Sequence, residues 1–185
     1  KSFFPYEKLT IQSVQIINSR YHIVTFNERI PEKVETGDLI ENLCAYPEFT
    51  VRNCDISRNR ARGLLLSTPK KTVIENNYFH TEMEALLIPV ESGHWYESGS
   101  VTNLVIRNNT FQDCNHSGFN RGVIRFKTDD DNDNIAFRNI QIIDNKFNHF
   151  DNCIMEVSNA DNLLFKGNII TQTNTFPKLF PENPA

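Results

Sequence analysis

The stretch that decides the fold is Val73-Ile-Glu-Asn-Asn-Tyr-Phe79, because its pattern returns as Val105-Ile-Arg-Asn-Asn-Thr-Phe111 and as Ile142-Ile-Asp-Asn-Lys-Phe147. Related copies stand on either side, as Val51-Arg-Asn-Cys-Asp-Ile56 and Phe165-Lys-Gly-Asn-Ile-Ile170. The last apolar residues of the five copies are spaced by 23, 32, 36 and 23 residues. Repetition at intervals of about 20 to 50 residues indicates a solenoid, in which the shortest spacing is one bare coil.

Side chains alternate in character within each copy. One column is apolar and the next is largely charged, which is the period-two pattern of a strand with one buried face. We therefore expect strands and no helix. The apolar column contains Val51, Ile74, Ile106, Ile142 and Phe165, and the charged column contains Arg52, Glu75, Arg107 and Lys166.

A further column is rich in asparagine. Asn tolerates the left-handed backbone of a sharp corner, and its amide can bond to the Asn of the neighbouring coil. The sequence therefore predicts an asparagine ladder at a corner of the solenoid. Its members are Cys54, Asn77, Asn109, Asn145 and Asn168.

A second apolar run follows each copy, so every coil holds two or three short strands. Residues 49–172 are predicted to form the coils of a right-handed parallel β-helix, in an all-β chain. Residues 1–48 alternate in polarity but lack the Asn corner, and we expect a small N-terminal antiparallel β element or the end of an insert. Residues 173–185 contain three prolines and are expected to form a C-terminal tail.

Composition excludes several classes of protein. The formal charge of −4 lacks the basic surplus of a nucleic-acid binder. The sequence offers no apolar stretch long enough to span a membrane. The four cysteines form no CxxC pair, so we expect no thiolate metal site. Because the chain opens with Lys1, it reads as a processed or excised piece.

Two long insertions mark the candidate binding face. They occupy residues 89–103 and 127–139 and leave the same corner of adjacent coils, so they are expected to form one wall. The first contains Trp95 between Glu91 and Glu97. An indole face stacks on sugar rings and carboxylates bind sugar hydroxyls, which predicts a sugar site. The alternative is that Trp95 caps the hydrophobic core and the glutamates are solvated.

Arg60 and Arg62 stand at the corner that leads into the second apolar run of their coil. Two arginines on one side of a short strand can clamp a carboxylate or bond sugar oxygens, and the alternative is a salt-bridged surface ridge. Glu84 holds the equivalent corner of the next coil. The sequence leaves open whether Glu84 faces the same groove or solvent.

The second insertion contains Asp129, Asp131 and Asp133, the spacing with which a calcium loop begins. The sixth position of that loop requires Gly, and Asn134 stands there instead. A bidentate Glu should follow, and Ile140 occupies its place. We therefore expect a solvated acidic loop and no metal site.

Several of these elements together resemble the C-terminal part of glycoside hydrolase family 110, the bacterial α-1,3-galactosidases. The resemblance rests on Asn59-Arg-Ala-Arg-Gly-Leu-Leu-Leu-Ser-Thr-Pro69, Trp95-Tyr-Glu-Ser-Gly99 and Gly37-Asp-Leu-Ile-Glu-Asn42, with the repeat copies between them. It covers roughly residues 30–170. The resemblance implies an inverting exo-hydrolase of terminal α-galactosyl residues that needs no cofactor. It also implies a secreted protein, extracellular or periplasmic, with a glycan substrate.

Inverting hydrolysis requires two carboxyl groups about 6.5 to 9.5 Å apart. Family members place catalytic aspartates, including an adjacent Asp-Asp pair, upstream of the Arg-Ala-Arg-Gly element. This chain has no such pair before residue 50, so the catalytic residues stay unassigned, and two alternatives stay open. Either the catalytic coils are missing from this piece, or the chain is a divergent relative. On this interpretation Trp95, Glu97 and Glu91 hold the sugar, while Arg60 and Arg62 support the groove.

Two rival functions stay open. One is a non-catalytic carbohydrate-binding or structural β-helix module. The other is a calcium-dependent polysaccharide lyase, in which the loop at Asp129 binds the metal and Arg125 serves as the base.

Overall fold

The computed structural model describes residues 3–95, 99–128, 133–151 and 153–182, and the chain divides into two compact units. The smaller unit is Pro5–Leu43. It contains two strands, β1 (Ile11–Ile16) and β2 (His22–Phe26), which pair antiparallel. The larger unit runs from Cys44 onward and includes the first four residues.

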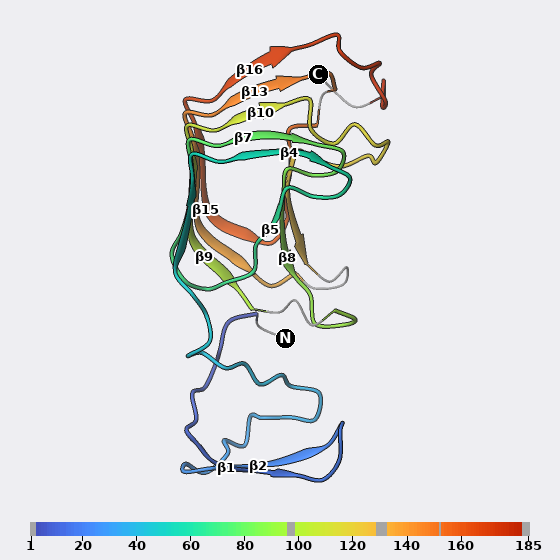
Figure 1. Ribbon diagram of the computed structural model, residues 1–185. Coiled ribbons are helices and arrows are strands. Elements are labelled where there is room, and N and C mark those ends of the chain that lie inside the picture. The colour runs from blue at the N-terminus through green and yellow to red at the C-terminus, as the bar shows by residue number, and fades with distance from the viewer. Residues whose placement is uncertain (1–2, 96–98, 129–132, 152, 183–185) are drawn as a thin grey trace. The chain divides into compact units, whose positions relative to one another are not determined.

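The larger unit is built from three parallel sheets, which the chain visits in a fixed order, once in each repeat (Figure 1). Sheet I contains β3 (Phe49–Arg52), β6 (Thr72–Glu75), β9 (Val101–Arg107), β12 (Phe137–Ile143) and β15 (Ala160–Lys166). Sheet II contains β4 (Asp55–Asn59), β7 (Tyr78–Thr81), β10 (Thr110–Gln112), β13 (Lys146–His149) and β16 (Ile169–Gln172). Sheet III contains β5 (Leu64–Leu65), β8 (Leu86–Val90), β11 (Ile124–Thr128) and β14 (Met155–Glu156).

These sheets confirm the prediction of an all-β chain with parallel strands, and no helix occurs among the described residues. Nor does that part of the chain contain a helix long and apolar enough to cross a membrane. Figure 1 shows the strands of sheet II lying one beside the next in the order β4, β7, β10, β13 and β16. Each strand therefore pairs with its counterpart from the next repeat.

The strand register confirms the columns expected from the sequence. In sheet I, Ile74 pairs with Ile106 and Ile106 with Ile142, and all three side chains are completely buried. In sheet II, the ring of Phe111 stacks between Phe79 and Phe147 at centroid distances of 5.0 and 4.8 Å. Identical side chains at matching positions thus form the core between the sheets.

The asparagine ladder is confirmed, but the left-handed corner lies one residue earlier than expected. Asn77 donates through Nδ2 to Oδ1 of Asn109, and Asn109 donates to Asn145 in the same way, both at 3.0 Å. Asn145 continues the ladder to Asn168 at the same distance. At this corner, positive φ falls on the residues directly before the ladder, namely Asn53, Asn76, Asn108, Asp144 and Gly167. Neighbouring residues therefore divide the two roles, since one makes the corner and the next makes the ladder.

The register of sheet III shows where the two insertions leave. β8 and β11 are parallel neighbours in which Pro89 pairs with Lys127 and Val90 with Thr128. Both insertions therefore start from the carboxyl ends of adjacent strands, as expected from the sequence.

Candidate functional site

The outer face of sheet III carries charged side chains next to apolar ones. Leu65, Leu87, Arg125 and Glu156 occupy matching positions in the four strands. The residues on either side of Arg125, Ile124 and Phe126, are buried in the core. Since strand side chains alternate between faces, the row that includes Arg125 points outward.

Glu84, just before β8 begins at Leu86, is completely buried and faces three arginines. Its Oε1 accepts a hydrogen bond from Nη1 of Arg121 at 3.2 Å and lies 3.7 Å from Nη1 of Arg125. Its Oε2 lies 3.8 Å from Nε of Arg62. Arg125 also donates from Nε to Glu156 at 3.0 Å. We call these five residues the arginine cluster.

This arrangement settles which way Glu84 faces. A buried carboxylate is costly unless charged partners surround it, and here three guanidinium groups, from the repeats before and after that of Glu84, meet one carboxylate. Arg62 belongs to the repeat before that of Glu84, and Arg121 and Arg125 both belong to the repeat after it, so the cluster links three successive repeats. The sequence pointed to Arg62 but missed Arg121 and Arg125 as its companions.

Two glycines allow the repeats to approach closely beside the cluster. A Cβ on Gly63 would lie 2.5 Å from the carbonyl oxygen of Ala85, and a Cβ on Gly122 would lie 2.6 Å from the backbone nitrogen of Glu156. Each glycine directly follows an arginine, Arg62 or Arg121. The repeated Arg-Gly dipeptide was the sequence signal that could have identified Arg121.

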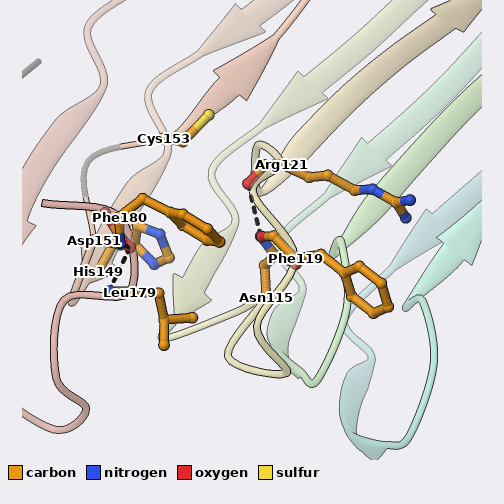
Figure 2. A pocket seen from close by; sticks show the side chains of 8 residues that line it. All are labelled: Asn115, Phe119, Arg121, His149, Asp151, Cys153, Leu179 and Phe180. Atoms are coloured by element: carbon orange, nitrogen blue, oxygen red, sulfur yellow. Dashed lines mark hydrogen bonds between the residues drawn. The ribbon is translucent and has the colours of Figure 1, made fainter. Parts of the chain in front are cut away.

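Phe119 extends the cluster with an exposed aromatic ring. The guanidinium of Arg121 lies 4.6 Å from the centre of this ring, which is 43% exposed. Figure 2 shows the side chains of Arg121 and Phe119 directed to the same side, away from His149 and Asp151. Arg121 is fixed at its other end, because its carbonyl accepts a hydrogen bond from Asn115 at 2.6 Å.

A small pocket lies on the far side of Arg121 (Figure 2). It is lined in part by the buried side chains of His149 and Asn115, and by Asp151, which accepts hydrogen bonds from the backbone of Leu179 and Phe180. Burial lowers the pKa of His149 to about 4, although the nearby aspartates act in the opposite direction. Among the described residues, no three His, Cys, Asp or Glu side chains are grouped so as to hold a metal.

The loop after β8 presents Trp95 to solvent. Its indole is 72% exposed and contacts the edge of His94 at a centroid distance of 4.5 Å. Glu91 accepts backbone hydrogen bonds from His94 and from Trp95, the latter at 2.7 Å. Desolvation raises the pKa of Glu91, but these hydrogen bonds outweigh it and the pKa is lowered. The carboxylate of Glu91 therefore shapes the loop that carries Trp95.

The predicted sugar-binding residues do not gather at one point. Trp95 follows the carboxyl end of β8, whereas Arg62 contacts Glu84 at its beginning. Five strand residues separate the two ends by roughly 17 Å. Arg60 is exposed and is not one of the three arginines that pair with Glu84. Glu97 lies outside the described residues, as do Asp129 and Asp131 of the acidic loop.

Comparison with known proteins finds a family model for the N-terminal residues and relatives that match most of the chain. Residues 1–40 match the family model described as GLAA-B beta-barrel domain II. Over a longer stretch, the chain is 39% identical to alpha-1,3-galactosidase A of Bacteroides fragilis, across 91% of this chain and 29% of that protein. It is 38% identical to alpha-1,3-galactosidase B of Bacteroides thetaiotaomicron, across 88% of this chain and 27% of that protein.

A third relative, alpha-1,3-galactosidase B of Akkermansia muciniphila, is 33% identical across 90% of this chain and 22% of its own length. The resemblance expected from the sequence is therefore confirmed. The chain spans less than a third of the length of these relatives.

Proposed function

We propose that the larger unit is a right-handed parallel β-helix. Each repeat contributes one strand to each of the sheets it reaches, and a hydrogen-bonded Asn ladder runs along one corner. Stacked repeats of this kind are typical of solenoids. In this proposal residues 49–172 are the coils, the smaller unit Pro5–Leu43 is the separate β element, and the tail begins at residue 173.

We further propose that the chain is the sugar-binding part of an inverting exo-α-1,3-galactosidase that removes terminal α-galactosyl residues from glycans. The observation that carries this proposal is the similarity to proteins named alpha-1,3-galactosidase along about nine tenths of the chain. The exposed indole of Trp95 offers a flat apolar surface on which a galactose ring can stack. The loop held by Glu91 fixes that surface in place.

The carboxylates described here have structural roles in this proposal. Glu84 is buried among arginines and Glu91 accepts backbone hydrogen bonds, so neither is assigned to proton transfer. Inversion needs a general acid and a general base on opposite faces of the sugar. We propose that other repeats of the enzyme supply both groups and that the enzyme acts outside the cytoplasm.

The test measures galactose release from α-1,3-galactobiose by this chain and by the full-length gene product that contains it. Release by the full-length product is expected, and release by neither would overturn the assignment. Binding of galactobiose to this chain is measured in parallel by calorimetry. Trp95→Ala should weaken that binding strongly, whereas Tyr78→Ala should not, because Tyr78 is an exposed aromatic residue on sheet II.

A non-catalytic carbohydrate-binding module is the second candidate, favoured by the structural engagement of Glu84 and Glu91. It predicts galactobiose binding without turnover, in the full-length product as well as in this chain. The same two measurements therefore separate the candidates.

A further inference from the structure

The arginine cluster carries a surplus of positive charge. Arg62, Arg121 and Arg125 bring three positive charges to two carboxylates, Glu84 and Glu156. The chain as a whole is negative, with a formal charge of −4. Two arginines would balance the two carboxylates. The burial of Glu84 therefore does not by itself explain the third positive charge.

The surplus resides on the arginines that solvent can reach. Arg125 is the least exposed of the three and is shared between Glu84 and Glu156. Arg62 and Arg121 have side chains that are 37% and 29% exposed. The one ion pair of Arg62 within the described chain is the 3.8 Å contact with Glu84, and its Nε makes no hydrogen bond there.

The remaining N–H groups of these two arginines suit an oxyanion. A guanidinium presents several donors in a planar fork that matches the oxygens of a carboxylate or of a tetrahedral oxyanion. Glu84 holds the two guanidinium groups in place from beneath. A ligand would therefore meet donors that are already ordered, which lowers the entropic cost of binding.

Phe119 adds the surface that a sugar needs. Its ring is exposed and lies against the guanidinium of Arg121 at 4.6 Å. The ring can pack against the apolar face of a pyranose while the arginines bind a charged substituent. Together these groups offer both elements of acidic-sugar recognition at one place, at the beginning of the sheet III strands and opposite the Trp95 loop.

We propose that Arg62, Arg121 and Phe119 form a second sugar subsite, selective for a glycan unit that bears a carboxylate or a sulfate ester. The inference rests on the proposed function in taking the ligand to be a glycan. Since the subsite and Trp95 stand at opposite ends of β8, the acidic unit lies some sugar units away from the terminal galactose.

The experiment compares three oligosaccharides of equal length that end in an α-1,3-linked galactose. One is neutral, one carries a uronic acid at an internal unit, and one carries a sulfate ester at the same unit. Binding to this chain is measured by calorimetry at low and high salt. We expect at least one acidic ligand to bind about tenfold more tightly than the neutral ligand, because a hydrogen bond to a charged group is worth about one power of ten. High salt should reduce that preference.

Matched variants locate the preference. Arg62→Gln and Arg121→Gln should each remove most of it, whereas Arg60→Gln should leave it unchanged, because Arg60 is exposed but lies outside the cluster. Arg62→Lys keeps the charge and should retain part of the preference. Circular dichroism and thermal unfolding establish that each variant is folded.

Three outcomes decide the inference. Equal affinity for acidic and neutral ligands overturns it and leaves galactose binding intact. An equal effect of Arg60→Gln and Arg62→Gln also overturns it, because the preference would then be a general effect of charge. Binding of acidic oligosaccharides that lack galactose, without binding of galactobiose, would support the second subsite and contradict the proposed galactoside specificity.

Discussion

Arg62 Nε lies 3.8 Å from Glu84 Oε2, and neither atom makes a hydrogen bond within the described chain. The pair is therefore joined by charge and not by a formed hydrogen bond. Arg121 is held more tightly, since it donates to Oε1 of the same carboxylate at 3.2 Å. Arg62 is thus the cluster arginine whose side chain can move most readily toward a ligand. Glu84 is the carboxylate that pairs with all three arginines.

Replacement of Glu84 by Gln should destabilise the larger unit strongly. The change removes the charge that three arginines share and leaves their guanidinium groups close together without compensation. Breaking a buried ion pair from one side typically costs about 3 to 5 kcal/mol. The free energy of unfolding in urea measures the effect. Glu82→Gln is the matched control, since Glu82 is exposed, and a loss for Glu84→Gln no larger than that of the control would contradict the assigned role.

Replacement of Asn109 by Ala should also destabilise the unit. Asn109 is buried, and its amide donates to Asn145 and to the carbonyl of Ile74 while its Oδ1 accepts from Asn77. Loss of these bonds leaves buried groups unpaired, at a cost of roughly 1 to 3 kcal/mol each. Thermal unfolding measures the effect.

The neighbouring position separates the ladder from the corner. Asn108 has φ of 53° and is exposed, so Asn108→Gly should be nearly neutral, because glycine adopts this conformation without steric cost. Asn108→Val should destabilise the corner by about 1 to 2 kcal/mol. If both variants behave alike, the left-handed corner is not what Asn108 provides.

Stability should fall as the pH drops below 6.5, because of His149. Burial lowers its pKa from 6.5 to about 4, so between these values the unfolded chain binds a proton that the folded chain rejects. The contribution of neutral His149 is complete above pH 6.5, declines as the pH falls, and is lost below about pH 4. The full difference corresponds to roughly 3 kcal/mol.

The measurement is the free energy of unfolding between pH 7 and pH 5, where the aspartates and glutamates contribute least. His149→Asn removes the titrating group and should flatten the slope in this window. An equal slope in the variant would show that His149 does not titrate in the way its burial requires.

Much of the fold could be predicted because each repeat has the same alternation of apolar and polar residues. The predicted register was correct at every position of the columns headed by Val51 and by Ile56, since parallel strands place equivalent residues side by side. The left-handed corner was misplaced by one residue, from Asn77 to Asn76, because both positions of the copy hold Asn and either can adopt positive φ.

The candidate site was harder to predict because the segment that completes it does not repeat. Arg121 follows residues 113–120, which have no counterpart in the other copies, so the spacing of the repeats does not align it with Arg62. Only the shared Arg-Gly dipeptide relates the two positions. Glu84 could have faced solvent, and only the approach of three arginines from the two neighbouring repeats shows that it is buried. The length of β8 sets Trp95 apart from Arg62, a separation that residue types alone do not reveal.

Glu91 is expected to contribute to galactose binding through the loop that carries Trp95. Its carboxylate accepts the backbone N–H groups of His94 and Trp95, so it acts on the sugar through the position of the indole. Glu91→Ala should weaken galactobiose binding by about tenfold, because the loop must then be ordered on binding. The informative measurement is a double-mutant cycle with Trp95→Ala. If Glu91 acts only through Trp95, the double variant binds no more weakly than Trp95→Ala alone, and a further additive loss would instead show that Glu91 contacts the sugar directly.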